Sequence, residues 1–115
     1  MKSWHFRQDG NLYSCMTATI TNESNIYTIT VSGRFTSDAA PDFLQVVDPL
    51  MQKKGIIVVL ELGEMDFISS AGIRCFVLLH KTFSACGSTL TLRNMPPQIV
   101  DIFRMTALLD KFTVE

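Results

Sequence analysis

Hydrophobic and polar residues alternate in two early segments of the chain, residues 14–21 and 26–32. Alternation with a period of two is typical of a β-strand, so both segments are predicted to be strands. The polar residues 22–25 separate them, and a connection this short favours antiparallel pairing. Gly33 follows the second segment and is predicted to end it. Residues 56–60 are apolar throughout, which predicts a central strand covered on both faces.

Three other segments have the spacing of amphipathic helices. In residues 39–52 apolar side chains recur every three or four positions, and residues 36–38 (Thr-Ser-Asp) offer N-cap candidates before them. Residues 70–85 show the same spacing, and Gly87 is predicted to stop that helix. Two prolines then open a third predicted helix over residues 98–105.

The predicted elements follow the order β-β-α-β-α-β-α-β, with the last two strands at residues 88–93 and 111–114. Helix-then-strand steps of this kind are typical of a mixed α/β sheet with right-handed crossovers. The chain has 115 residues, of which 47% are hydrophobic, enough for one domain with its own core. We assign that domain to residues 14–115 and expect residues 1–13, which are poorly patterned, to form an N-terminal extension.

Charge and composition argue against several classes of function. The net charge is -1, which gives no electrostatic basis for binding nucleic acid or an anionic membrane surface. The apolar runs are far shorter than a bilayer span, and residues 1–7 lack the apolar stretch of a signal peptide, so we expect no direct membrane insertion. The spacing of Cys15, Cys75 and Cys86 favours neither a disulfide framework nor a zinc site, which predicts a cytoplasmic protein.

The stretch Ser69-Ser70-Ala71-Gly72 is the most informative in the chain. It lies where the apolar segment that begins at Ile56 gives way to the second predicted helix. Backbone N–H groups are unpaired at a helix N-terminus and the helix dipole favours negative charge there, so such a site can hold a phosphoryl group on a serine. The simpler interpretation is that the serines only cap the helix.

An enzymatic role for Ser70 has little support in the sequence. Residues 68–72 do not match the Gly-x-Ser-x-Gly frame of a serine nucleophile. His80 lies about two and a half turns along the same predicted helix, too far away to act as its base. The chain also carries no Walker motif or other glycine-rich phosphate loop. We therefore expect a protein that is not an enzyme and that uses neither a cofactor nor a metal.

A stripe of the second predicted helix begins at Ser70 and continues through Arg74, Val77 and Lys81. These positions share one face of a helix because the helix repeats every 3.6 residues. The opposite side carries the apolar residues that are expected to face the core. The stripe is either an ordinary solvated face or part of an interface with another protein, and the spacing leaves both interpretations open.

The stretch from Gly63 to Arg74 resembles the signature of STAS domains, specifically that of bacterial anti-sigma factor antagonists, in which an Asp-Ser-Ser-Gly-Leu type motif follows the central strand. Val31–Phe35 resembles the family's strand ending in Gly-Arg-Leu, and Ala40–Phe43 resembles its first helix start. Ile102–Leu108 resembles its late Phe-x-x-Ser/Thr-Gly-Leu segment. The resemblance covers roughly residues 14–115. It implies a mixed sheet of about five strands with helices mainly on one face.

The resemblance also implies a function. Antagonists of this family bind an anti-sigma factor with serine kinase activity and so free a sigma factor for transcription. The kinase phosphorylates the serine two residues before the glycine, which is Ser70 here, and a PP2C-type serine phosphatase resets the switch. The family binds through the serine loop, the helix that follows it and the loop after the second strand. These regions correspond here to Thr36, Ser37, Asp38, Ser69, Ser70, Gly72, Arg74, Val77 and Lys81.

Three positions depart from the family pattern. Ser69 stands where an acidic residue commonly precedes the phosphorylated serine, Thr36 replaces the Asp after the second strand, and Ala107 replaces the late glycine. These departures give weight to a second role. In that role the chain is a non-catalytic STAS subunit of a larger regulatory or lipid-transport complex, and Ser70 is only a helix cap.

Overall fold

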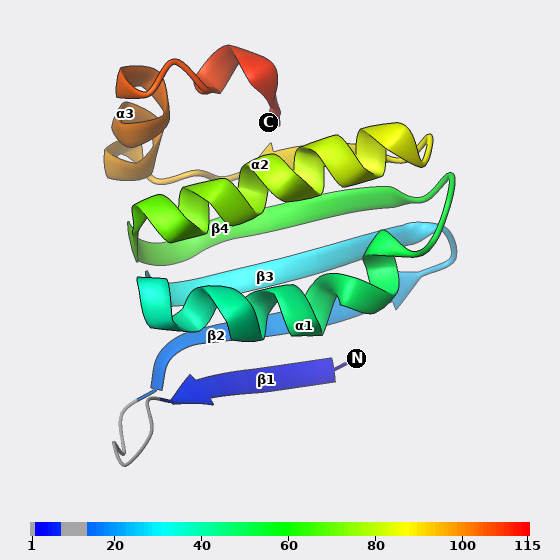
Figure 1. Ribbon diagram of the computed structural model, residues 1–115, viewed down its shortest axis with the longest axis horizontal. Helices are drawn as coiled ribbons and strands as arrows, with labels where there is room; N and C mark the ends of the chain where they lie inside the picture. Colours follow the sequence, from blue (N-terminus) through cyan, green and yellow to red (C-terminus); the bar gives the residue numbers. More distant parts are fainter. Residues whose placement is uncertain (1, 8–13) are drawn as a thin grey trace.

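The computed structural model describes residues 2–7 and 14–115, which form one six-stranded mixed sheet and the helices that pack on it (Figure 1). The strands are β1 (Lys2–Arg7), β2 (Ser14–Glu23), β3 (Ile26–Phe35), β4 (Ile57–Ile68), β5 (Thr89–Arg93) and β6 (Thr113–Val114). The helices are α1 (Ala40–Met51), α2 (Ser70–Ala85) and α3 (Pro97–Met105), with short 3-10 helices η1 (Ser37–Ala39) and η2 (Leu109–Lys111). The α/β class and the order of the elements predicted from β2 onward are confirmed.

The strands lie across the sheet in chain order, and β2 runs opposite to the other five described strands. β1 pairs with β2 and β2 with β3 in antiparallel fashion, whereas the pairs β3–β4, β4–β5 and β5–β6 are parallel. Each parallel step needs a crossover connection, and α1, α2 and α3 provide them. This topology places the beginnings of α1 and α2 at the same end of the sheet, directly after β3 and β4.

β1 was not among the predicted elements. Its backbone pairs with β2 from Lys2 opposite Ile20 to Arg7 opposite Ser14. Part of the segment that the sequence suggested as an extension therefore supplies an edge strand of the sheet (Figure 1). Residue 1 and residues 8–13 lie outside the described residues.

Two predictions about the strands were wrong. β3 does not end at Gly33 but continues to Phe35, because Gly33 adopts φ 87 and the register with β4 shifts beside it, which bends the strand without ending it. β4 is not covered on both faces. Val58 and Leu60 are fully buried, but Ile57, the first residue of the strand, is 40% exposed. Since α1 and α2 lie on one face of the sheet, alternate residues of β4 point away from them (Figure 1).

Aromatic side chains fill the core between the sheet and the helices. Phe35 on β3, Phe43 on α1 and Phe76 on α2 are fully buried. The ring centroids of Phe35 and Phe43 lie 5.0 Å apart and those of Phe35 and Phe76 lie 5.8 Å apart, both in edge-to-face arrangements that aromatic rings favour. The cluster packs α1 and α2 against the last residue of β3, and so positions the segments that carry the candidate site.

Candidate functional site

The two serines of the motif fall on either side of the start of α2. Ser69 is the N-cap residue: its backbone is extended, at φ -84 and ψ 170, and its hydroxyl oxygen accepts a hydrogen bond from the Gly72 N–H at 3.1 Å. The Ser69 N–H donates to the Phe35 carbonyl at 2.8 Å. Ser70 is the first residue of the helix, and its side chain is exposed. The capping interpretation therefore applies to Ser69 and leaves the Ser70 hydroxyl accessible to another molecule.

Gly72 is buried in the first turn of α2, where the helix meets the sheet. A Cβ atom at this position would lie 2.8 Å from Ile68 Cγ1 and 2.8 Å from Phe35 Cδ1. Both neighbours are themselves buried, so they have little room to move away. The absence of a side chain at Gly72 therefore lets the start of α2 rest on the ends of β3 and β4, and this contact fixes the place of Ser70 on the surface.

Thr36, Ser37 and Asp38 connect β3 to α1. The predicted N-cap role of this segment was wrong: η1 leads directly into α1, Ala39 takes the N-cap position of α1, and neither Thr36 nor Ala39 makes a side-chain capping hydrogen bond. Ser37 and Asp38 are exposed. The Thr36 hydroxyl oxygen is buried and has no hydrogen-bond partner among the residues that the structure describes.

A groove of about 410 Å³ between α1 and α2 joins two of the predicted regions. Ser37 lines it on the side of η1, and Ala71 and Arg74 line it from the first turns of α2. The other lining residues are mostly apolar: Ala40, Pro41, Leu44, Cys75 and Leu78. The region before α1 and the region after Ser70 are thus two ends of one hollow, although more than 30 residues separate them in the sequence.

The predicted stripe on α2 divides in the structure. Ser70, Arg74 and Lys81 are exposed, whereas Val77 is half-buried and packs against the core. Arg74 is the stripe residue that also borders the groove. Arg74 therefore borders the same groove as residues of α1. Val77 is more buried than its neighbours on the stripe.

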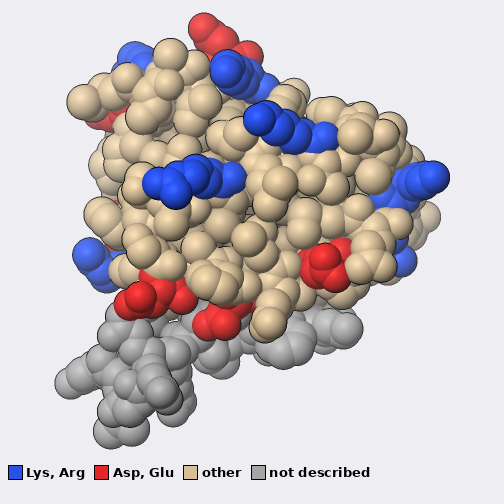
Figure 2. Space-filling model, viewed as in Figure 1, with Lys and Arg blue, Asp and Glu red and all other residues tan. Residues whose placement is uncertain are grey.

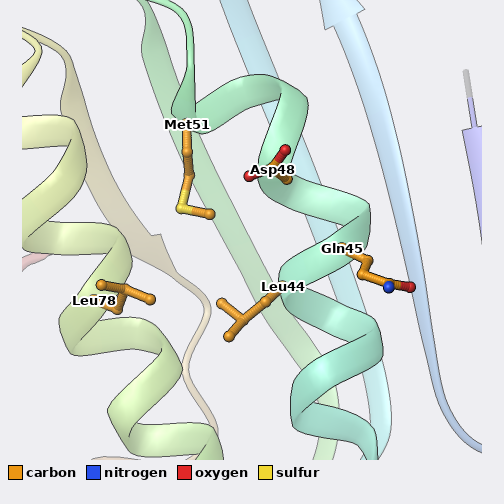
Figure 3. Close-up of a pocket in the computed structure, with 5 residues that line it drawn as sticks. All are labelled: Leu44, Gln45, Asp48, Met51 and Leu78. Carbon is orange, nitrogen blue, oxygen red and sulfur yellow. The ribbon is translucent and has the colours of Figure 1, made fainter.

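Sequence reasoning missed the contribution of α1. A second hollow of about 300 Å³ shares Leu44 and Leu78 with the first. It is also lined by Gln45, Asp48 and Met51 (Figure 3). Figure 3 shows Leu44 and Leu78 pointing toward one another from the facing helices. The sequence did contain a sign of this contribution. Leu44 and Leu78 widen the apolar side of their helices, so that this side extends from the core toward the surface.

Cys75 and His80 are two further side chains of α2 whose types take part in catalysis in other proteins. Burial raises the pKa of the Cys75 thiol to about 11, so the thiol stays protonated near neutral pH and is a weak nucleophile. The His80 ring packs against Phe112, with 5.3 Å between the ring centroids. No group of three or more His, Cys, Asp or Glu side chains in the described part of the chain could hold a metal ion. Within the same residues, every helix is too short or too polar to span a bilayer.

The chain belongs to the STAS domain family, because the family model matches residues 17–115, which include most of β2, the four strands after it and every helix. Its fold is also that of solved family members. The anti-sigma factor antagonist SpoIIAA, whose structure is known in the unphosphorylated form, superimposes with a TM-score of 0.73 at 12% sequence identity, over 85% of this chain and 87% of SpoIIAA.

Two proteins of similar sequence are both named as anti-sigma factor antagonists. A proposed anti-sigma factor antagonist of Bordetella bronchiseptica, BtrV, is 37% identical over 57 residues, which are 50% of this chain and 49% of BtrV. The match therefore spans about half the length of that relative. An anti-sigma-B factor antagonist of Listeria monocytogenes is 27% identical over 82 residues, which are 71% of this chain and 72% of that protein.

Proposed function

We propose that this chain is an anti-sigma factor antagonist. In its unphosphorylated form it binds an anti-sigma factor serine kinase, and the sigma factor that the kinase would otherwise hold is free for transcription. The proposal is supported by membership of the STAS family and by similarity to two proteins that are named as antagonists. The chain acts by binding and not by catalysis, and this role places it in the cytoplasm.

The division of roles between Ser69 and Ser70 is the observation that carries the proposal. If the phosphorylated serine were also the N-cap residue, its modification would remove a stabilising hydrogen bond. Ser69 makes that bond with Gly72, and Ser70 beside it is exposed at the first position of α2. A kinase can therefore act on Ser70 while the cap of the helix stays in place.

A phosphoryl group on Ser70 would change the surface more than the fold. It adds about -1.5 to -2 charges at neutral pH. The N-terminus of α2 favours a nearby negative charge, so the folded chain tolerates the group. A partner that covered Ser70 would have to remove water from this charge, which costs several kcal/mol unless an opposite charge is supplied. Phosphorylation would thus release the kinase without unfolding the antagonist.

The proposed binding surface includes the residues that the family resemblance indicates except Gly72, which is buried against the sheet and positions Ser70 from beneath. Ser37 and Arg74 line one groove, and Ser70 directly precedes Ala71, which also lines it, at the start of α2. The exposed Arg74 guanidinium lies one turn from Ser70 and is available to an acidic group on the kinase. The groove adds Pro41, Leu44 and Leu78, which give the surface an apolar part.

Phosphate mapping tests the proposal directly. The cognate anti-sigma factor kinase and ATP are incubated with the wild-type chain and with Ser70→Ala and Ser69→Ala, and the modified residue is located by mass spectrometry. We expect phosphate on Ser70 in the wild type and in Ser69→Ala, no phosphate in Ser70→Ala, and its removal by a PP2C-type phosphatase. Phosphate on Ser69, or labelling that persists in Ser70→Ala, would contradict the assignment.

A further inference from the structure

The groove described above and the second hollow adjoin, and together they form one longer groove between α1 and α2. From here on, the groove means this combined one. They adjoin at Leu44 and Leu78 and have volumes of about 410 Å³ and about 300 Å³. Leu78 is 43% exposed, a high value for a leucine that sits between two helices. Figure 3 shows Met51 reaching into the same space from the last turn of α1. The groove is therefore an open apolar channel that runs from the start of α1 to its end.

The two walls of this groove carry opposite charges. The charged residues of α1 are all acidic, Asp42 and Asp48, and Asp48 lines the groove. The charged residues of α2 are all basic, Arg74 and Lys81, and Arg74 lines the groove. In Figure 2 acidic side chains lie over the α1 side of this face and basic side chains over the α2 side. An occupant would thus meet an acidic wall, an apolar floor and a basic wall.

The walls also decide which backbone conformation an occupant can adopt. Both are helices, whose backbone groups are already paired, so the groove offers no strand edge to an extended peptide. A helix satisfies its own backbone hydrogen bonds and presents apolar side chains at i, i+4 and i+7 along one side. α1 has 12 residues, so the groove is about 18 Å long and matches about three helical turns.

From these observations, and resting on the function proposed above, we propose that the groove receives an amphipathic helix of the anti-sigma factor kinase. The apolar side chains of that helix fill the space around Leu44 and Leu78. One of its flanks is acidic and lies along Arg74 and Lys81, and the other is basic and lies along Asp48. Electrostatic complementarity of this kind selects the partner and sets the direction in which its helix lies.

The arrangement links the groove to Ser70. Ala71 and Arg74 line the groove within the first turns of α2, next to Ser70. A phosphoryl group on Ser70 places negative charge at the end of the basic wall, where the acidic flank of the occupant lies. Like charges repel, and Arg74 can turn toward the phosphate and away from the partner. The phosphate therefore weakens the same contact that gives the groove its selectivity.

Designed peptides test the charge pattern of the groove. Three stapled helical peptides share the same leucine stripe, and their flanks are one acidic and one basic, both acidic, or both basic. Binding to the intact chain is measured by fluorescence anisotropy. We expect the peptide with unlike flanks to bind about tenfold more tightly than the other two. Equal binding of all three peptides overturns the proposal.

Variants of the walls and of the floor sharpen the test. Asp48→Lys should shift the preference to the peptide with two acidic flanks, and Arg74→Glu with Lys81→Glu to the one with two basic flanks. Leu78→Lys should abolish binding, whereas the control Ile26→Lys should not, because Ile26 is also 43% exposed but lies on β3. Circular dichroism confirms that each variant is folded, and an unchanged preference in the folded wall variants contradicts the proposal.

The kinase itself separates this inference from the proposed function. If the kinase binds the wild type and the folded Asp48→Lys and Leu78→Lys variants equally well, the groove is not its docking site, although the antagonist function stands. The opposite result is that no anti-sigma factor kinase binds although the three peptides keep their expected order of affinity. The helix would then not come from such a kinase, and the proposed antagonist function would be wrong. Loss of kinase binding in the groove variants, with the Ile26→Lys control unaffected, supports both.

Discussion

Ser69 and Ser70 are neighbours with the same side chain, yet the backbone gives them different surroundings. Ser69 still has the extended backbone of the strand, which lets its hydroxyl turn back to the Gly72 N–H, whereas Ser70 already has helical geometry and points to solvent. The sequence could indicate a helix start at this pair but not which serine caps it. That choice depends on where the helix begins, and a shift of one residue would reverse the two roles.

The two serines should therefore differ in their effect on stability. Ser69→Ala removes the capping hydrogen bond and should lower the free energy of unfolding by about 1 kcal/mol. Ser70→Ala removes an exposed hydroxyl and should change it by less than about 0.5 kcal/mol. Urea denaturation followed by circular dichroism measures both. A larger loss in Ser70→Ala than in Ser69→Ala would show that Ser70 is the cap.

Gly72 should tolerate no side chain. Gly72→Ala would place a Cβ atom 2.8 Å from atoms of Ile68 and Phe35, and the resulting overpacking should cost about 1–3 kcal/mol of stability. Gly63→Ala is the matched control, because the nearest atom to its Cβ would be Glu61 Oε1 at 3.4 Å, an ordinary contact. Equal denaturation midpoints for the two variants would mean that α2 can move away from the sheet at little cost.

At the scale of elements, the sequence predicted best where the periodicity belongs to the element itself. The helix predicted at residues 70–85 is α2, Ser70–Ala85, because its apolar positions repeat at helical spacing and a glycine follows it. β1 was missed because its place depends on backbone pairing with β2, which no local pattern reports. The groove was missed for a related reason: Leu44 and Leu78 acquire their meaning only when α1 and α2 pack side by side.

A polar contact between β4 and β5 makes the stability of the sheet depend on pH. Arg93 Nε donates to Glu61 at 2.6 Å and Asn94 Nδ2 donates to Glu61 at 2.7 Å. Burial by itself would raise the pKa of Glu61, but these hydrogen bonds and the charge of Arg93 outweigh it, so the pKa lies below its ordinary value of 4.5. The folded state therefore favours the carboxylate.

The difference in stability between Glu61→Gln and wild type should depend on pH, because the pKa of Glu61 is lowered in the folded state. The contribution of the carboxylate is fully present above its ordinary pKa and is lost as the pH falls through the lower pKa of the folded state. The variant should be less stable than wild type by about 0.5–1 kcal/mol at pH 7, and the difference should shrink toward zero in strong acid. Urea denaturation across pH, with Glu64→Gln on the same strand as the exposed control, checks this. A difference that grows in acid would refute the assignment.

At the scale of the whole molecule, the proposed switch requires a body that keeps its shape while its surface changes charge. Ser70→Asp adds a negative charge at the N-terminus of α2, which the helix dipole accommodates, so the melting temperature should stay within a few degrees of wild type. Affinity for the kinase should fall by roughly tenfold or more, equal to about 1.4 kcal/mol. Titration calorimetry measures this. Ser70→Asn is the neutral control of similar size, and equal affinities of the Asp and Asn variants would argue against a switch that acts through charge.

The edge strand β1 has a consequence for association between copies of the chain. β2 is a strand of ten residues, and β1 occupies the hydrogen-bonding groups on its outer side. An uncovered strand of this length is a template for another chain, whereas β6 at the opposite edge has two residues and offers little to pair with. A shortened chain that starts at Ser14 should therefore self-associate through β2 as its concentration rises, and sedimentation velocity would detect it. By leaving an open edge of six residues in place of one of ten, β1 shortens the stretch of strand on which another copy of the chain can pair.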